Sequence, residues 1–207
     1  MIDGRDLKRI RLELTKYDET REKVLGLSRS VTRLCGWSII QTHRMELGKA
    51  AGTLKEARQS LKEAKNLASN YSELASSGSV RVAEQEYAEA LGLYDLVKTG
   101  KMPNLAKTGV LHSCYLLGLL DLIGELRRLT LNHLRAGEGV KAEQTLAKME
   151  HMYEDLLSLD HTSIIPTFRN KSDTARRIIE STRGDVVTEI RRLSLENAIR
   201  SLEGKLR

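Results

Sequence analysis

The chain has 207 residues and a net charge of +6, and its composition already excludes several classes of protein. The length is enough for a substantial hydrophobic core and is most simply that of one domain covering residues 1–207. Leu, Ala, Glu, Lys and Arg dominate while proline occurs twice, which is typical of long helices. The expected fold class is therefore all-α.

The N-terminal residues and the cysteines indicate an intracellular protein. Charges occur throughout the first residues, without the apolar core of a signal peptide, and no stretch approaches a charge-free membrane-spanning length. Cys35 and Cys114 lie in helix-like segments without metal-motif spacing, which favours two reduced thiols. We expect a soluble, cytoplasmic chain with no membrane partner.

Charge and aromatic content limit the partners that the chain can bind. Lys and Arg outnumber Asp and Glu by 34 to 28, which permits a polyanionic partner without requiring one. Trp37, Phe168 and six tyrosines are too few for the stacking platforms that recognise single-stranded bases. If nucleic acid binds, contacts to phosphates and to backbone shape should dominate.

Hydrophobic periodicity predicts a series of long helices. The first segment is either one helix with a bend near Gly26 or two helices in series, and its apolar stripe, which begins with Leu7, must be covered by other helices or by another subunit. We therefore expect oligomerisation. Helical segments are predicted at about residues 6–46, 47–74, 80–97, 111–137, 139–159 and 170–205, with residues 101–109 forming a loop or a short helical turn.

Carboxylates interrupt the apolar faces of two of these helices. Glu86 and Glu89 share a face of the third segment with Val82 and Leu93. Buried carboxylates without partners are very costly, so they indicate bound cations, compensating basic groups or shifted pKa values.

A second acidic pair lies in the most apolar segment. Asp121 and Glu125 are four residues apart and project from one face of a helix that is too apolar to be exposed all round. If the two helices pack side by side, the two pairs form one cluster. The four carboxylates of this expected cluster are Glu86, Glu89, Asp121 and Glu125.

The four carboxylates are the candidate catalytic and metal-binding residues. Mg²⁺ and Mn²⁺ prefer carboxylate and water ligands and act together with the phosphate oxygens of a substrate, which favours phosphodiester or pyrophosphate hydrolysis. The alternative is that they form structural salt bridges with Arg81, Arg127 or Arg128. A ferritin-like di-iron site is disfavoured, because the Glu-x-x-His partners of such bundles are missing.

The same segments resemble the translin family, and in particular its catalytic type, translin-associated factor X. QEYAEAL at residues 85–91 resembles the Q-E-Y-V-E-A segment of that type. YLLGLLDLIGELRRLTLNHL at residues 115–134 resembles its Y-L-L-G-x-x-D-L-T-G-E-L-M-R-x-x-x-N stretch. LSRSVT at residues 27–32 and HR at residues 43–44 match a third place. The C-terminal third is similar only in helical character and a basic start.

The resemblance implies a bundle of about six to seven helices that assembles into a hollow octamer, encloses RNA and cleaves it with Mg²⁺ held by the four carboxylates. Translin itself lacks the pair that corresponds to Glu86 and Glu89 and is regarded as the non-cleaving, RNA-binding partner, so this chain is similar to the catalytic type. Its shorter connection between Val97 and Val110, and the lack of a basic N-terminal extension, imply a compact homo-oligomer that needs no separate translin subunit.

Four arginines are candidate RNA contacts. Arg81 resembles a basic position in the nucleic-acid-binding stretch of translin, with a helix-end salt bridge as the alternative. Arg128 matches both cleaving and non-cleaving members, which implies a structural or RNA-positioning role. Arg29 and Arg33 are weaker candidates, because charged residues on a long helix are usually only solvated. The expected ligand is single-stranded or duplex RNA, with single-stranded DNA as a further candidate.

Two other functions stay open. All-α nucleotide pyrophosphohydrolases also place an E-x-x-E pair beside a second acidic pair around Mg²⁺, although their second motif is typically E-x-x-D and not D-x-x-x-E. A translin-type scaffold that binds RNA or DNA without cleaving it is the second alternative. Turnover of free nucleoside triphosphates would favour the first, and activity that is insensitive to Glu86→Ala and Asp121→Ala would favour the second.

Overall fold

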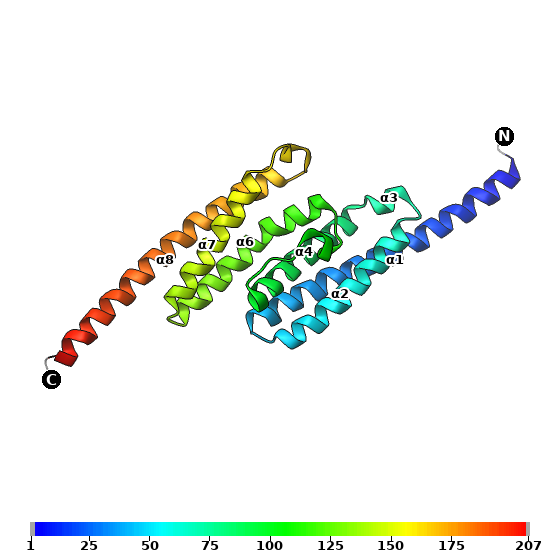
Figure 1. The fold of residues 1–207 in the computed structure, drawn as a ribbon. Helices are drawn as coiled ribbons and strands as arrows, with labels where there is room; N and C mark the ends of the chain where they lie inside the picture. The colour runs from blue at the N-terminus through cyan, green and yellow to red at the C-terminus, as the bar shows by residue number, and fades with distance from the viewer. Residues whose placement is uncertain (1–2, 206–207) are drawn as a thin grey trace. The chain divides into compact units, whose positions relative to one another are not determined.

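The computed structural model describes residues 3–205, and within this range every regular element is a helix (Figure 1). The predicted all-α class is confirmed, and the short helix α5 lies inside the segment predicted as a loop or helical turn. The short elements are α3 (Ser72–Ala75), α5 (Leu105–Thr108) and the 3-10 helix η1 (Thr162–Ile164). The long helices are α1 (Gly4–His43), α2 (Leu47–Ala68), α4 (Gly78–Thr99), α6 (His112–Arg135), α7 (Gly139–Leu157) and α8 (Phe168–Lys205).

Helix α1 is one continuous helix of 40 residues that runs through Gly26, so the alternative of two helices in series is wrong. Asp3 caps its start by accepting a hydrogen bond from the Arg5 backbone N–H at 2.8 Å. Glycines with positive φ follow the last residues of α4 and α5, namely Gly100 at 74° and Gly109 at 67°. This left-handed conformation ends a helix at low cost only in glycine.

The chain divides into two compact units, one ending at Gly118 and the other beginning at Leu119, so α6 starts in the first and continues into the second. In the first unit α1 packs along α2 and α4, and α2 also packs on α4. In the second unit α7 packs against α8 (Figure 1). A single domain for residues 1–207 stays a prediction.

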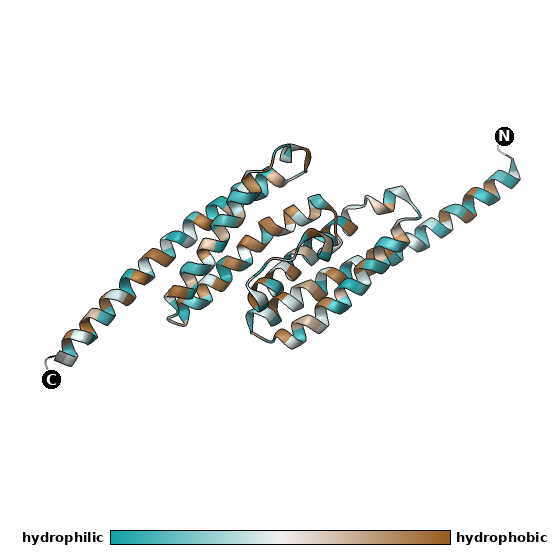
Figure 2. Cartoon of the chain, in the orientation of Figure 1, coloured by the Kyte–Doolittle hydropathy of each residue, from teal (hydrophilic) through white to brown (hydrophobic). Residues whose placement is uncertain are grey.

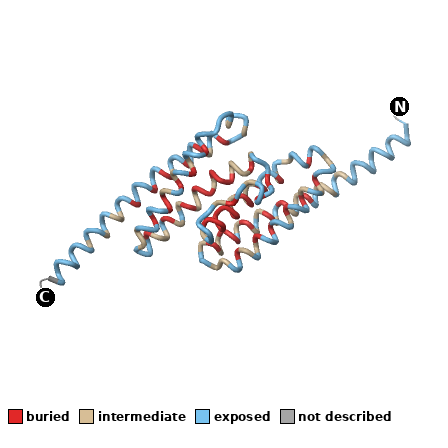
Figure 3. Tube along the Cα trace, viewed as in Figure 1, coloured by how far each residue is buried: buried red, intermediate tan, exposed pale blue. Residues whose placement is uncertain are grey.

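Helix α4 is the buried element of the first unit (Figure 3). Apart from Gln85, Glu86 and Glu89, which are half-buried, every residue from Ala83 to Leu96 is buried. Leu93 is completely inaccessible, as the apolar stripe predicted. Val82, which the stripe placed on the same covered face, is 49% exposed, although Val80 of the same turn is buried.

Two long helices carry apolar side chains that the described residues leave exposed. Hydrophobic bands recur along the N-terminal part of α1 and the C-terminal part of α8 (Figure 2), which are exposed in Figure 3. The exposed apolar residues that share one helix face are Leu7, Ile10 and Leu14 in α1, and Leu195, Ile199 and Leu202 in α8. We call these two sets the terminal apolar stripes.

None of the helices between residues 3 and 205 combines the length and the apolar composition needed to cross a membrane.

Helix α6 approaches α4 at a glycine. A Cβ atom built on Gly118 would lie 2.7 Å from the backbone oxygen of Gln85, 3.0 Å from the Cβ of Ala88 and 3.2 Å from the backbone nitrogen of Glu89. Backbone atoms cannot move aside as the end of a flexible side chain can, so a side chain here would push the two helices apart. The absence of a side chain at position 118 therefore sets the spacing between α6 and the part of α4 that holds Glu86 and Glu89.

We predict that Gly118→Ala destabilises the protein although alanine is the better helix former. Overpacking against backbone should lower the free energy of unfolding by about 1–3 kcal/mol. Gly124→Ala on the same helix is the matched control, because a Cβ there meets no described atom within 4 Å. It should change the free energy of unfolding by roughly +0.5 to +1 kcal/mol. Urea denaturation measures both, and equal effects of the two variants would contradict the close approach at Gly118.

Candidate active site

Glu86 and Glu89 lie one turn apart on α4, and both are half-buried. They interrupt an otherwise buried run, with Tyr87 and Ala88 between them at 2% and 0% exposure. The helical spacing that predicted a shared face is therefore present. Their partial exposure means that solvent, and hence a solvated ion, can reach the carboxylates without unfolding the helix.

The inner face of α1 lies beside this acidic pair. Cys35 is fully buried, and burial raises the pKa of its thiol, with the negative charges of Glu86 and Glu89 raising it further. All three effects favour the neutral thiol over the thiolate. Because a thiolate is the metal-binding form of cysteine, the possible ligands around this pair are carboxylate oxygens, not sulfur.

Asp121 and Glu125 lie in the second unit, on the part of α6 that follows Gly118, and both are half-buried. Asp121 accepts a hydrogen bond from the ammonium group of Lys171 in α8. Glu125 lies 3.7 Å from the guanidinium of Arg128, one turn further along α6. These two carboxylates therefore contact basic side chains within their own unit.

The predicted alternative of structural salt bridges holds for Arg128. Arg128 pairs with Glu125, as that alternative proposed. Arg127 instead contacts Asp185 at 2.9 Å and Thr182 Oγ1 at 2.9 Å in α8. The partner of Asp121 was missed, because Lys171 lies 50 residues away in sequence and only tertiary packing brings it near.

The four carboxylates suit hard divalent cations in their chemistry. Carboxylate oxygens are the donors that Mg²⁺ and Mn²⁺ prefer. Asp121 pairs with the ammonium of Lys171, and Glu125 pairs with the guanidinium of Arg128. Across residues 3–205, no three His, Cys, Asp or Glu side chains are placed together as a ready set of metal ligands. One cluster formed by all four carboxylates therefore stays a prediction.

The most deeply buried carboxylates of α4 were not predicted. Glu84 is 1% exposed, and its Oε1 accepts a hydrogen bond from Lys65 of α2 at 2.5 Å. Asp95 is 6% exposed and pairs with Lys107 of α5 at 2.5 Å. Each therefore has a lysine as counter-charge, which is how buried carboxylates are normally retained. The sequence signal for Asp95 was its place in the apolar run at residues 91–97, whereas Glu84, next to Gln85 and Glu86, had no such signal.

Glu84 also affects the second cysteine. Burial and the neighbouring Glu84 carboxylate raise the pKa of the Cys114 thiol to about 11. Both cysteines are free and buried, as expected for two reduced thiols.

The arginines predicted to contact RNA are accessible, although they occupy different places. Arg81 is exposed in the first turns of α4, and its charge reaches Cys114. Arg29 and Arg33 are exposed one turn apart on α1. Arg128 is held near Glu125. Their role in binding RNA stays a prediction.

We predict that Lys65→Met lowers the free energy of unfolding by about 3 kcal/mol, because it leaves the Glu84 carboxylate buried without a counter-charge. Replacing both members, in Lys65→Met/Glu84→Leu, should recover most of that loss, since an apolar pair needs no compensation. Lys62→Met, an exposed position on the same helix, is the control and should change stability by less than about 0.5 kcal/mol. A double variant as unstable as the single one would show that the ion pair is not what holds Glu84.

Comparison with known proteins places the chain among relatives of the same architecture. It is 32% identical over 192 residues to an uncharacterized protein of Methanocaldococcus jannaschii, covering 92% of this chain and 85% of the relative. The solved structure of apo-NeC3PO superposes with a TM-score of 0.82 at 25% identity, covering 91% of this chain and 98% of that chain. AfC3PO in complex with duplex RNA gives a TM-score of 0.81 at 27% identity, covering 89% and 96%.

The sequence profile described as the Translin family matches residues 19–181, a region that contains all four carboxylates. The match covers well over half of the chain and agrees with the structural similarity. The chain belongs to the translin family.

Proposed function

We propose that this chain is a Mg²⁺-dependent endoribonuclease that binds RNA inside a homo-oligomer and hydrolyses phosphodiester bonds with little sequence specificity. RNA is the proposed ligand because one of the structures similar to this chain is a complex with duplex RNA. Membership of the translin family supports the same ligand class. Mn²⁺ is a second candidate cation, since it accepts the same ligands.

The observation that carries the proposal is the contrast between two kinds of carboxylate on α4. Glu84 and Asp95 are buried and paired with lysines, as structural acids are. Glu86 and Glu89 are half-buried and lie together on one face. Two neighbouring carboxylates that solvent can reach on an otherwise buried helix are placed to bind a hard cation, which supports a functional role.

In the proposed reaction Glu86, Glu89, Asp121 and Glu125 would be the residues that hold the cation, and they would orient a water molecule toward the scissile phosphate. The cation supplies Lewis-acid activation of the phosphate and makes water more acidic. One of these four carboxylates would also accept the proton of the attacking water. Arg81, Arg128, Arg29 and Arg33 hold the backbone phosphates, and such contacts carry no sequence information.

A non-catalytic scaffold is the second candidate, and one observation favours it. Asp121 and Glu125 already have Lys171 and Arg128 as counter-charges. If these ion pairs persist in the presence of Mg²⁺, the second acidic pair does not bind the cation, and the chain binds RNA without cutting it.

We predict that Glu89→Gln abolishes Mg²⁺-dependent cleavage of RNA while leaving the fold intact. Loss of a direct cation ligand should lower the cleavage rate at least about 100-fold, since changes in outer-shell groups alone cost 10- to 100-fold. The measurement is cleavage of labelled single-stranded and duplex RNA in Mg²⁺ and in EDTA, with thermal unfolding as the test of folding. Glu63→Gln on the exposed face of α2 is the matched control and should cleave at the wild-type rate.

Equal cleavage by wild type and Glu89→Gln would rule out this site. RNA binding without cleavage by wild type would establish the scaffold. Turnover of free nucleoside triphosphates without RNA cleavage would instead favour a nucleotide pyrophosphohydrolase.

We further propose that the terminal apolar stripes are covered by other copies of the chain in an octamer. Leu14 and Leu195 are each 62% exposed, and long runs of exposed apolar side chains usually mark contact surfaces.

Light scattering during size-exclusion chromatography should therefore give a mass of eight times the 23.3 kDa of one chain. Charging the α8 stripe, in Leu195→Glu/Leu202→Glu, should reduce that mass, because carboxylates are poorly tolerated in an apolar interface. Leu157→Glu, at an exposed position of α7, is the control and should leave the mass unchanged. A wild-type monomer or dimer would contradict the octamer.

A further inference from the structure

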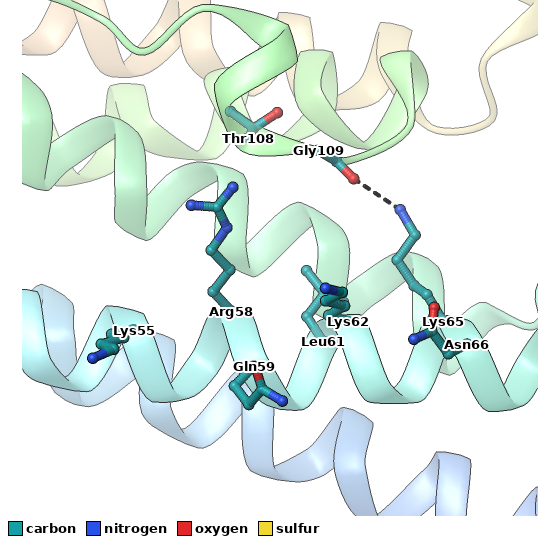
Figure 4. A pocket seen from close by; sticks show the side chains of 9 residues that line it. All are labelled: Lys55, Arg58, Gln59, Leu61, Lys62, Lys65, Asn66, Thr108 and Gly109. Atoms are coloured by element: carbon teal, nitrogen blue, oxygen red, sulfur yellow. Dashed lines mark hydrogen bonds between the residues drawn. The ribbon is translucent and has the colours of Figure 1, made fainter.

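A basic groove lies on α2, and its composition is unlike that of the carboxylate site. The space is about 480 Å³ and lies between α2 and the turn at the end of α5 (Figure 4). Its lining includes four basic residues of α2, together with two residues of the turn: Lys55, Arg58, Lys62 and Lys65, and Thr108 and Gly109. We call this space the α2 groove.

The four cations occupy one face of α2. Their spacings of three, four and three residues match helical periodicity, so they line up along the helix axis. Over ten residues the rise is about 15 Å. In Figure 4 the guanidinium of Arg58 extends from α2 toward Thr108. Burial raises the pKa of the Tyr87 hydroxyl, and the positive charge of Arg58 partly offsets that rise.

The charge of the groove is largely uncompensated. No Asp or Glu lines it. Within the described part of the chain, Lys55, Arg58 and Lys62 form no ion pair, whereas Lys65 is paired with Glu84. Glu56 and Glu63 lie on the same helix as exposed residues outside the lining. Three positive charges therefore face one concave space, an arrangement whose self-repulsion a bound polyanion would relieve.

One wall of the groove is held rigidly. Lys65 Nζ donates hydrogen bonds to the buried Oε1 of Glu84 and to the backbone oxygen of Gly109 at 2.8 Å (Figure 4). Gly109 has a φ of +67°, a left-handed conformation that glycine adopts without strain. These contacts tie α2 to α4 and to the α5 turn, so the cations project from a fixed surface and a ligand need not order it on binding.

The lining selects phosphates over bases. It contains no aromatic side chain on which a base could stack, and Leu61 is its one apolar residue. A row of cations about 15 Å long spans several phosphates, because one strand of a duplex carries a phosphate about every 3.4 Å along the axis. A free mononucleotide would use only part of this row.

We infer that the α2 groove binds the phosphate backbone of an RNA strand, at a site separate from the four carboxylates. Glu84 lies on the groove side of α4, and Glu86 is two residues further on, about 200° around the helix, so the groove and the acidic pair belong to different faces. The groove anchors RNA and takes no part in cleavage. The inference rests on the proposed function only in taking RNA as the ligand.

The test compares RNA binding by the full chain and by Lys55→Gln/Arg58→Gln/Lys62→Gln, with Lys65 kept because it stabilises Glu84. Fluorescence anisotropy of a labelled single-stranded RNA in EDTA measures affinity over a range of salt concentrations. Each phosphate contact adds about 0.7 to the slope of log affinity against log salt, so the variant should lose about 2 from that slope and at least tenfold in affinity at low salt.

A matched control removes three exposed cations elsewhere, in Arg135→Gln/Lys148→Gln/Arg169→Gln. It should keep more than half of the wild-type affinity. The inference is overturned if the groove variant binds like wild type, if it loses no more than the control, or if the wild-type protein binds no RNA. It is also overturned if AMP competes as strongly as inorganic polyphosphate, since the groove would then be a mononucleotide site.

Cleavage in Mg²⁺ separates this inference from the proposed function. If the wild type cleaves RNA and the groove variant binds RNA as well as the wild type does, RNA binding by the α2 groove is refuted and the proposed nuclease function stands. If the groove variant loses RNA binding and the wild type does not cleave RNA, the groove inference stands and the proposed nuclease function is refuted.

Discussion

The burial of α4 is the constraint on which the first unit depends. An acidic residue in such a helix is tolerated only with a counter-charge or with access to solvent. Glu84 and Asp95 each have a lysine as counter-charge, Lys65 of α2 and Lys107 of α5. The two ion pairs therefore also fix where α2 and α5 lie against α4. Glu86 and Glu89 are reached by solvent. One acidic face of α4 is therefore accessible to solvent.

Packing at Gly118 acts on the same helix from another side. Its backbone contact with Gln85 and Glu89 leaves no room for a side chain, so α6 meets α4 at the turn that bears the acidic pair. The distance between the two helices at that turn depends on backbone contact and not on adjustable side chains.

Sequence reasoning recovered the helices because their signals are local. Apolar periodicity and the turn residues near Gly100 and Gly137 predict ends for α4 and α6 that lie within two residues of the observed ends. It recovered the shared face of Glu86 and Glu89 for the same reason, since i to i+3 spacing is enough. It missed the Lys65 partner of Glu84 and the Lys171 partner of Asp121, because those pairings depend on which helices pack together. It also missed the α2 groove. In the sequence the basic residues of α2 look like an ordinary solvated helix face, and only tertiary packing places the α5 turn beside them to form a groove.

Electrostatics connects the carboxylates with the basic surface. Ionised carboxylates repel the phosphates of RNA, and Glu86 and Glu89 lie close enough together for their fields to add. A strand could approach them only if cations neutralise the acids or if contacts elsewhere offset the repulsion. A net charge of +6 supplies such contacts, and Lys55, Arg58 and Lys62 place three of them in one groove. Under the proposed function, the basic groove on α2 would hold the strand and the acidic pair on α4 would take part in cleavage, so loss of the cation from the acidic pair would leave RNA binding in place.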